Sequence, residues 1–166
     1  MVDAPPRALI TAAAVELLTT LQERHGALMF HQSGGCCDGS SPMCYPDGDF
    51  LVGDRDVLLG LLDTGSEKHP GGTPVWIGDA QFELWKNTQL VIDAVPGRGG
   101  GFSLEAPEGM RFLSRGRAFS EVEIAALQAE TPVTGAQAGV AFVRGGRIPN
   151  TGSSVVADVV EACPVR

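Results

Sequence analysis

Potential metal ligands are concentrated in one short segment, HQSGGCCDGSSPMC, which spans residues 31–44. It holds three of the chain's four cysteines and one of its three histidines, namely His31, Cys36, Cys37 and Cys44. Thiolates are soft ligands and imidazole is borderline, so this set could complete a tetrahedral zinc site. Iron, an iron–sulfur cluster or copper(I) would also suit thiolates. The glycines would let the backbone wrap closely around a small ligand.

The same cysteines are compatible with two other roles. In a thiol-based redox sensor or enzyme, Cys44 could resolve an oxidised Cys36 or Cys37, or a thiol could capture an aldehyde as a thiohemiacetal. In a plain interaction module the cysteines would be structural, because free cysteine is often buried. His31 could likewise be a core histidine. No Ser-His-Asp constellation is readable, so a non-catalytic role is preferred over an enzymatic one.

A second candidate segment is the glycine-rich run GRGGGF, residues 97–102. No Lys-Ser/Thr pair follows it and no G-x-G-x-x-G opens a helix, so a phosphate-binding loop is excluded. A tight turn between two strands fits better, since glycine permits close backbone approach. We expect this turn to approach the cysteine segment, with Arg98, Phe102 and Glu105 lining a shared cofactor site.

Hydrophobic spacing predicts a helix followed by short strands. Apolar residues recur at helical spacing over about 8–24, and Gly26 would end that helix. The apolar run at 27–31 predicts a buried strand that leads into the cysteine segment. Further predicted elements are two short strands around a turn at 50–62, a surface loop at 63–74, a strand beginning at 75–77, a helix with Asp79 as N-cap, a strand at 89–95 and a capping-box helix at 121–130.

Composition and charge narrow the class of protein. The chain has 166 residues, 43% of them hydrophobic and 19% charged, as in a globular domain. Its formal net charge of -8 disfavours nucleic acid as a partner. No run of about 18 apolar residues predicts a membrane span. Because the N-terminus lacks the basic start of a signal peptide, we expect a cytoplasmic protein with reduced thiols.

Two stretches carry a family resemblance. ITAAAVELLTTLQERHGALMFHQSGGCCDGSSPMCYP and VWIGDAQFELWKNTQLVIDAVPGRGGGFSLEAPEG resemble the bacterial Domain of Unknown Function 779 family, over roughly residues 9–116. Members of that family are often encoded beside aldehyde dehydrogenases. The resemblance therefore implies an aldehyde dehydrogenase as partner, and it leaves the biochemical activity undefined.

The order of motifs also resembles the A-type iron–sulfur carriers, which have the HesB-like fold. The matching segments are Ile10-Thr11, Gly34-Gly35-Cys36, Ile77-Gly78-Asp79, the strand at 89–95 and the turn at 99–102. The carriers also have a Cys-Gly-Cys pair after the Gly-Phe turn, and residues 103–109 contain no cysteine. If the fold is shared, the ligand set has moved into the 31–44 segment.

Together these observations predict an α+β protein. We expect a HesB-like domain of small twisted mixed sheets over residues 8–116, followed by a C-terminal extension over 117–166 with a Gly/Val-rich tail. The expected function is a non-catalytic accessory protein that binds zinc or iron, or an iron–sulfur cluster, and supports an aldehyde dehydrogenase. A homodimer is compatible with this function, because a three-cysteine cluster site can borrow a ligand from a neighbouring chain.

Overall fold

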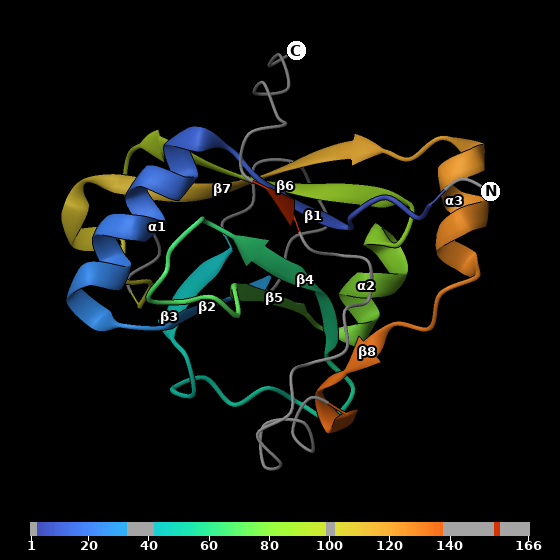
Figure 1. Ribbon diagram of the computed structural model, residues 1–166, viewed down its shortest axis with the longest axis horizontal. Coiled ribbons are helices and arrows are strands. Elements are labelled where there is room, and N and C mark those ends of the chain that lie inside the picture. The colour runs from blue at the N-terminus through green and yellow to red at the C-terminus, as the bar shows by residue number, and fades with distance from the viewer. Residues whose placement is uncertain (1–2, 33–41, 99–101, 138–154, 157–166) are drawn as a thin grey trace.

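Two β-sheets pack face to face, and two helices close the opposite ends of the space between them (Figure 1). The structure is a computed structural model that describes residues 3–32, 42–98, 102–137 and 155–156. The presence of helices together with two mixed sheets confirms the predicted α+β class.

The smaller sheet has three strands in the order β1-β6-β7. Strand β1 (Ala8–Ile10) runs parallel to β6 (Thr88–Pro96), and β6 pairs with β7 (Met110–Ala118) in antiparallel register. Strand β6 follows the predicted strand at 89–95 closely. The short 3-10 helix η1 (Ala106–Glu108) precedes β7.

The larger sheet has the order β3-β2-β5-β4-β8. Its strands are β3 (Met43–Pro46), β2 (Leu28–Gln32), β5 (Thr73–Ile77), β4 (Val57–Asp63) and β8 (Val133–Thr134), with β9 (Val155–Val156) also pairing with β4. Strand β2 pairs antiparallel with β3 and parallel with β5. The sequence correctly predicted β2, a strand at 75–77 and a loop before it, although β5 begins two residues earlier than predicted, at Thr73.

The main hydrophobic core fills the space between the sheets. Phe30 of β2 and Phe112 of β7 meet there edge to face, with ring centroids 4.8 Å apart. Helix α1 (Ala12–His25) contributes Leu18 and Leu21, and helix α2 (Asp79–Trp85) contributes Phe82 and Trp85. A second, smaller apolar cluster on the other face of the larger sheet is formed by Met29, Leu58, Trp76 and Val133, with Tyr45, Phe50, Val52 and Leu61 packed against it.

The predicted helix over 8–24 is wrong at its beginning. Residues 8–10 form strand β1, and the helix begins only after Thr11, whose side chain accepts a hydrogen bond from the N–H of Ala14. Thr11 is therefore an N-cap, which holds an extended backbone before the first turn. The apolar residues of β1 share the helical spacing, but pairing with β6 decides their conformation.

Two further element predictions need correction. Residues 50–62 do not form two strands, because only Val57–Asp63 is a strand and the preceding segment turns around Asp56, which accepts a hydrogen bond from the N–H of Gly53. The N-cap of α2 is Gly78, which makes no side-chain cap bond, so Asp79 is the first helical residue instead. An acidic residue there still interacts favourably with the helix dipole.

Helix α3 (Glu121–Gln128) has the predicted capping box between Ser120 and Glu123. Arg7, which directly precedes β1, connects α3 to the end of α2, since its guanidinium donates to the carbonyls of Lys86 and Leu127. Strand β7 continues through Ala118, and β8 joins the larger sheet. The division of the chain at residue 116 stays a prediction.

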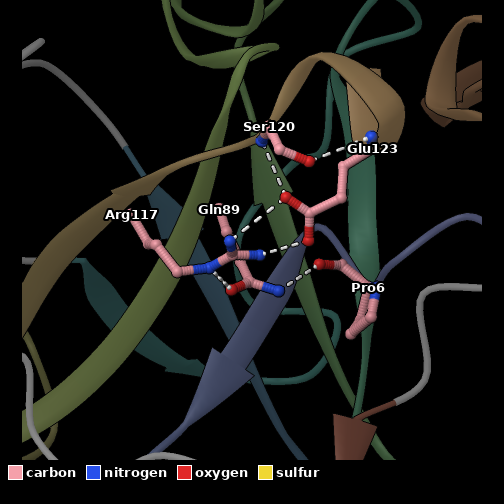
Figure 2. A network of polar contacts seen from close by, with 5 residues as sticks. All are labelled: Pro6, Gln89, Arg117, Ser120 and Glu123. Carbon is pink, nitrogen blue, oxygen red and sulfur yellow. Dashed lines mark hydrogen bonds and ion pairs between the residues drawn. The ribbon is translucent and has the colours of Figure 1, made fainter. Parts of the chain in front are cut away.

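The start of α3 is also tied to the smaller sheet by a polar network (Figure 2). The Arg117 guanidinium donates to Gln89 and, through two nitrogens, to the Glu123 carboxylate at 2.8 and 3.1 Å. The Gln89 amide in turn donates to the carbonyl of Pro6. Glu123 also accepts a bond from the N–H of Ser120 at 2.7 Å. The network therefore links the chain before β1, strand β6 and the helix cap.

Replacing Glu123 with glutamine is expected to lower stability by about 1 kcal/mol or less, because the network is partly exposed. The bonds from Arg117 and Ser120 lower the pKa of Glu123 to about 2. Since this folded-state pKa lies below the usual value of about 4.3, the contribution is present above that usual value and is lost as pH falls toward 2. Urea unfolding of the parent and of Glu123→Gln at pH 7 and pH 3 measures this contribution to the free energy of unfolding.

The matched control for this prediction is Glu121→Gln, which removes an exposed charge from the same first turn without touching Arg117. We expect this control to change the free energy of unfolding by only a few tenths of a kcal/mol. If the two variants behaved alike at both pH values, the network would contribute nothing beyond the helix dipole.

Candidate functional site

The segment after the glycine-rich run lies along the outer edge of β3, at Cys44. The N–H of Cys44 donates to the Ser103 hydroxyl at 2.9 Å, and the N–H of Leu104 donates to the carbonyl of Cys44 at 3.1 Å. These two bonds cover the edge of β3 and connect positions far apart in the sequence. The segment that follows the glycine-rich run therefore contacts the last residue of the cysteine segment, and the approach of the turn itself stays a prediction.

Glu105 is the charged residue that this arrangement places in the interior. It is 0% exposed, and its Oε2 accepts a hydrogen bond from the Ser103 hydroxyl. Its Oε1 is buried and has no hydrogen-bond partner among the described residues. Burial raises the pKa of Glu105, and the Ser103 hydroxyl and the nearby backbone N–H groups of Glu105 and Phe112 lower it by less. A buried carboxyl with a free oxygen is uncommon in native proteins.

Cys44 lies beside this carboxyl and is itself 0% exposed. Burial raises the pKa of the Cys44 thiol strongly, and the negative charge of Glu105 raises it further. The thiolate is the reactive form of cysteine, so a thiol in these surroundings is a poor nucleophile. A metal cation at the sulfur would reverse this preference, because a coordinated thiol is deprotonated.

The other residues predicted for the shared site lie elsewhere. Arg98 is exposed, and Phe102 is 89% exposed, so neither side chain lines the buried cluster of Cys44, Ser103 and Glu105. Cys36 and Cys37 lie outside the described residues. Of the three residues predicted to line a cofactor site, the structure brings only Glu105 to Cys44.

His31 and Cys44 project from opposite faces of the larger sheet. In the antiparallel register of β2 and β3, Phe30 lies opposite Cys44 and His31 lies opposite Met43. Neighbouring residues of a strand point to opposite faces, so Cys44 enters the core between the sheets and His31 enters the outer apolar cluster. The structure does not bring these two predicted ligands together.

His31 instead pairs with Asp56. Its Nε2 is 3.0 Å from Asp56 Oδ2, which also accepts a bond from the N–H of Gly53. The His31 ring packs on Phe50, with centroids 4.5 Å apart. Asp56 was missed because it lies 25 residues from His31, in a segment predicted as two short strands around a turn. The turn-forming run Gly-Asp-Arg-Asp was the available signal.

A second buried polar contact lies at the start of the cysteine segment. The Ser114 hydroxyl of β7 donates to Gln32 Oε1 of β2 at 2.6 Å, and both residues are fully buried. This bond crosses the core and joins the two sheets directly before residue 33. Sequence reasoning missed it, because serine and glutamine at these positions read as ordinary strand residues.

The described residues contain no complete set of metal ligands. Within residues 3–32, 42–98, 102–137 and 155–156, no group of three or more His, Cys, Asp or Glu side chains could hold a metal ion. Cys44 and Glu105 form a pair of neighbouring donors, one sulfur and one oxygen. A complete four-coordinate site would need further ligands from outside this set.

Comparison with protein families matches residues 17–118 to the domain of unknown function (DUF779). The chain belongs to this family. The DUF779 segment includes β2, β3 and the buried cluster, together with the whole region from the cysteine segment to β7. No curated protein and no solved structure matched the chain. The predicted likeness of this DUF779 protein to the HesB-like fold therefore stays a prediction.

The sequence predicted no membrane-spanning segment. No helix in the part of the chain that the structure describes is long and apolar enough to cross a membrane.

Proposed function

We propose that this DUF779 protein is a non-catalytic accessory protein that binds zinc or iron through a thiolate site centred on Cys44. The observation that supports this most is the position of Cys44, whose thiol is buried beside a buried carboxyl. Cys36 and Cys37, eight and seven residues earlier in the chain, are the proposed further thiolates. His31 is not in this set, because it projects from the opposite face of the sheet.

The surroundings of Cys44 favour a metal ligand over a redox thiol. A sensor or resolving cysteine needs an accessible sulfur with a lowered pKa. Cys44 has the opposite properties, because it is buried and its pKa is raised. A divalent cation would offset both the burial of the sulfur and the neighbouring negative charge. Binding would release the thiol proton, so affinity should rise with pH.

The first experiment is elemental analysis with an absorption spectrum, on protein purified without added metal and without oxygen. We expect about one zinc or iron per chain. Cys36→Ser, Cys37→Ser and Cys44→Ser should each lose most of this metal, and Cys44→Ala checks that the loss does not come from a buried hydroxyl. Cys163→Ser is the matched control and should retain the parent's metal.

Two results would overturn the proposal. One is a parent protein without metal, in which case thiol alkylation rates would show whether Cys36 or Cys37 is reactive. The other is parent-like metal content in all three serine variants. Circular dichroism of each variant separates loss of the site from loss of the fold.

We further propose an aldehyde dehydrogenase as the partner, on the basis of the family resemblance. Co-purification of the tagged chain with an aldehyde dehydrogenase of the same host tests this. We expect a complex in the metal-loaded parent and a weaker one in Cys44→Ser. Absence of any complex with the parent would contradict the partner and would leave the metal site unaffected.

A further inference from the structure

We infer that residues 133–137 form a protective strap, which covers the outer edge of β4 and thereby keeps that edge from pairing with a second copy of the chain. The inference is independent of the proposed metal site. It concerns the side of the larger sheet opposite β3, and it rests on the composition of β4 and on how the strap is seated beside it.

The outer edge of β4 is well suited to pairing with another chain. Beyond it, the described residues place only β8 and β9, which have two residues each. Residues 57–62 read Val-Leu-Leu-Gly-Leu-Leu, with no charge and no proline. Proteins commonly protect such an apolar edge with charges, proline or a covering segment. Since β4 carries a charge only at its last residue, Asp63, its protection depends on a cover.

The strap supplies this cover at the beginning of β4 (Figure 1). Its first two residues form β8 and pair antiparallel with Val57 and Leu58. The N–H of Gly135 then donates to the carbonyl of Asp56 at 2.8 Å, and the next N–H donates to another carbonyl of the same turn at 3.1 Å. The Val133 side chain is buried in the outer apolar cluster. The strap therefore occupies both the backbone edge and the apolar face beside it.

The seat of Gly135 shows how closely the strap fits. A Cβ at this position would overlap the carbonyl oxygen of Gly53 and would lie 3.1 Å from Val52 Cγ1. The φ of Gly135 lies outside the left-handed region, so glycine is needed here for contact rather than for backbone conformation. Glycine is the residue that allows two backbones to approach this closely.

The turn that receives the strap is held in place by side chains of the sheet. Asp56 Oδ2 accepts the N–H of Gly53 at 2.9 Å and lies 3.0 Å from His31 Nε2 of β2. The N–H of Asp56 donates in return to the carbonyl of Gly53 at 3.0 Å. His31 is thus a positioning residue for the turn, and the strap docks on a preformed surface.

The strap also lies outside the residues matched to the DUF779 family, which end at 118. Among the described residues within that match, no strand pairs with the outer edge of β4. The cover of β4 therefore comes from the part of this chain that follows the family segment.

The test is Gly135→Ala in the full chain, because the added methyl group cannot be seated against Gly53. We expect the strap to leave the turn, so that amide hydrogen exchange in residues 53–63 and 133–137 becomes about tenfold faster. We also expect dimers or larger species to form as the protein concentration rises. Mass spectrometry of exchanged peptides and light scattering after size-exclusion chromatography measure the two effects.

The matched control is Gly71→Ala. A Cβ at Gly71 meets open space, and its φ also lies outside the left-handed region. This control should exchange and elute like the parent. Parent-like exchange and mass in Gly135→Ala would overturn the inference. Faster exchange with an unchanged mass would overturn it too, because the edge of β4 would then be open without pairing.

A double variant shows whether β4 is the contact. Leu61→Lys, combined with Gly135→Ala, places a charge on β4 and should return the mass to that of the parent. Association that persists in the double variant would overturn the inference. If Gly135→Ala does not fold by circular dichroism, Val133→Thr provides the test, since it adds a hydroxyl to the buried side chain at nearly constant volume. A smaller shift to higher mass is then expected, and an unchanged mass contradicts the inference.

Discussion

Replacing Asp93 with alanine is expected to lower the free energy of unfolding by about 3–5 kcal/mol, because it leaves the Arg115 guanidinium buried without its partner. Arg115 Nε donates to Asp93 Oδ2 at 2.8 Å, and the two side chains are only 13% and 8% exposed. The other oxygen, Oδ1, accepts bonds from the Thr11 hydroxyl and the N–H of Ala94, each at 2.8 Å. Both oxygens of the Asp93 carboxylate therefore accept hydrogen bonds.

The position of Asp93 explains why the effect should be large. Asp93 is in the central strand of the smaller sheet, Arg115 is in β7, and Thr11 is the N-cap of α1. One carboxylate therefore connects three elements. Thr11→Val is the graded control, since it removes a single bond and leaves the ion pair, and it should cost about 1 kcal/mol. Urea unfolding at pH 7 measures both variants, and equal effects would contradict this account.

The same group predicts a dependence on pH. Burial raises the pKa of Asp93, but the bonds from Arg115, Thr11 and Ala94 together lower it by more, so the net pKa is below its usual value. The stabilisation is then fully present above the unfolded pKa of about 3.9 and is lost as pH falls through the lower folded pKa. The difference between parent and Asp93→Ala should therefore shrink in acid. A constant difference from pH 7 to pH 2 would contradict the ion pair as its cause.

Replacing Phe30 with alanine is expected to cost a similar amount, about 3–5 kcal/mol, for a different reason. Phe30 is 0% exposed and meets Phe112 of the opposite sheet edge to face. Its loss would leave a cavity where the two sheets contact each other. It would also remove the residue directly across from Cys44. We therefore expect lower stability together with weaker metal retention.

The control for Phe30→Ala is the same substitution at an exposed position. Phe102 is 89% exposed, so Phe102→Ala should change stability by no more than about 0.5 kcal/mol. Chemical unfolding of both variants measures the difference. Equal destabilisation by the two substitutions would show that the core between the sheets is not arranged as described.

Local patterns in the sequence determined much of the fold. The apolar run at 27–31 predicted β2, the run at 89–95 predicted β6, and the Ser-x-x-Glu spacing predicted the cap of α3. These signals are local, because hydrophobic spacing and capping depend on residues a few positions apart. The predicted approach of the glycine-rich turn to the cysteine segment stays a prediction, although Ser103, just after that run, contacts Cys44.

Partners distant in the sequence decided the remainder. Residues 8–10 continue the helical spacing of α1, but Leu9 pairs with Val91 of β6, and that pairing makes them a strand. The register of β2 and β3 sends His31 and Cys44 to opposite faces, and a shift of one residue would reverse this. The potential ligands within residues 31–44, read from the sequence alone, do not show which face of the sheet each side chain occupies.

The sequence by itself determined which groups could bind a metal, because donor chemistry belongs to the residue type. Only the tertiary structure decided which of them share an environment. It buries Glu105 near Cys44 while leaving Phe102, which was predicted for the same site, exposed, and it pairs His31 with Asp56. The physical reason is that burial and strand register arise from long-range packing, and these set whether a donor is solvated, paired with another residue, or free to take a cation.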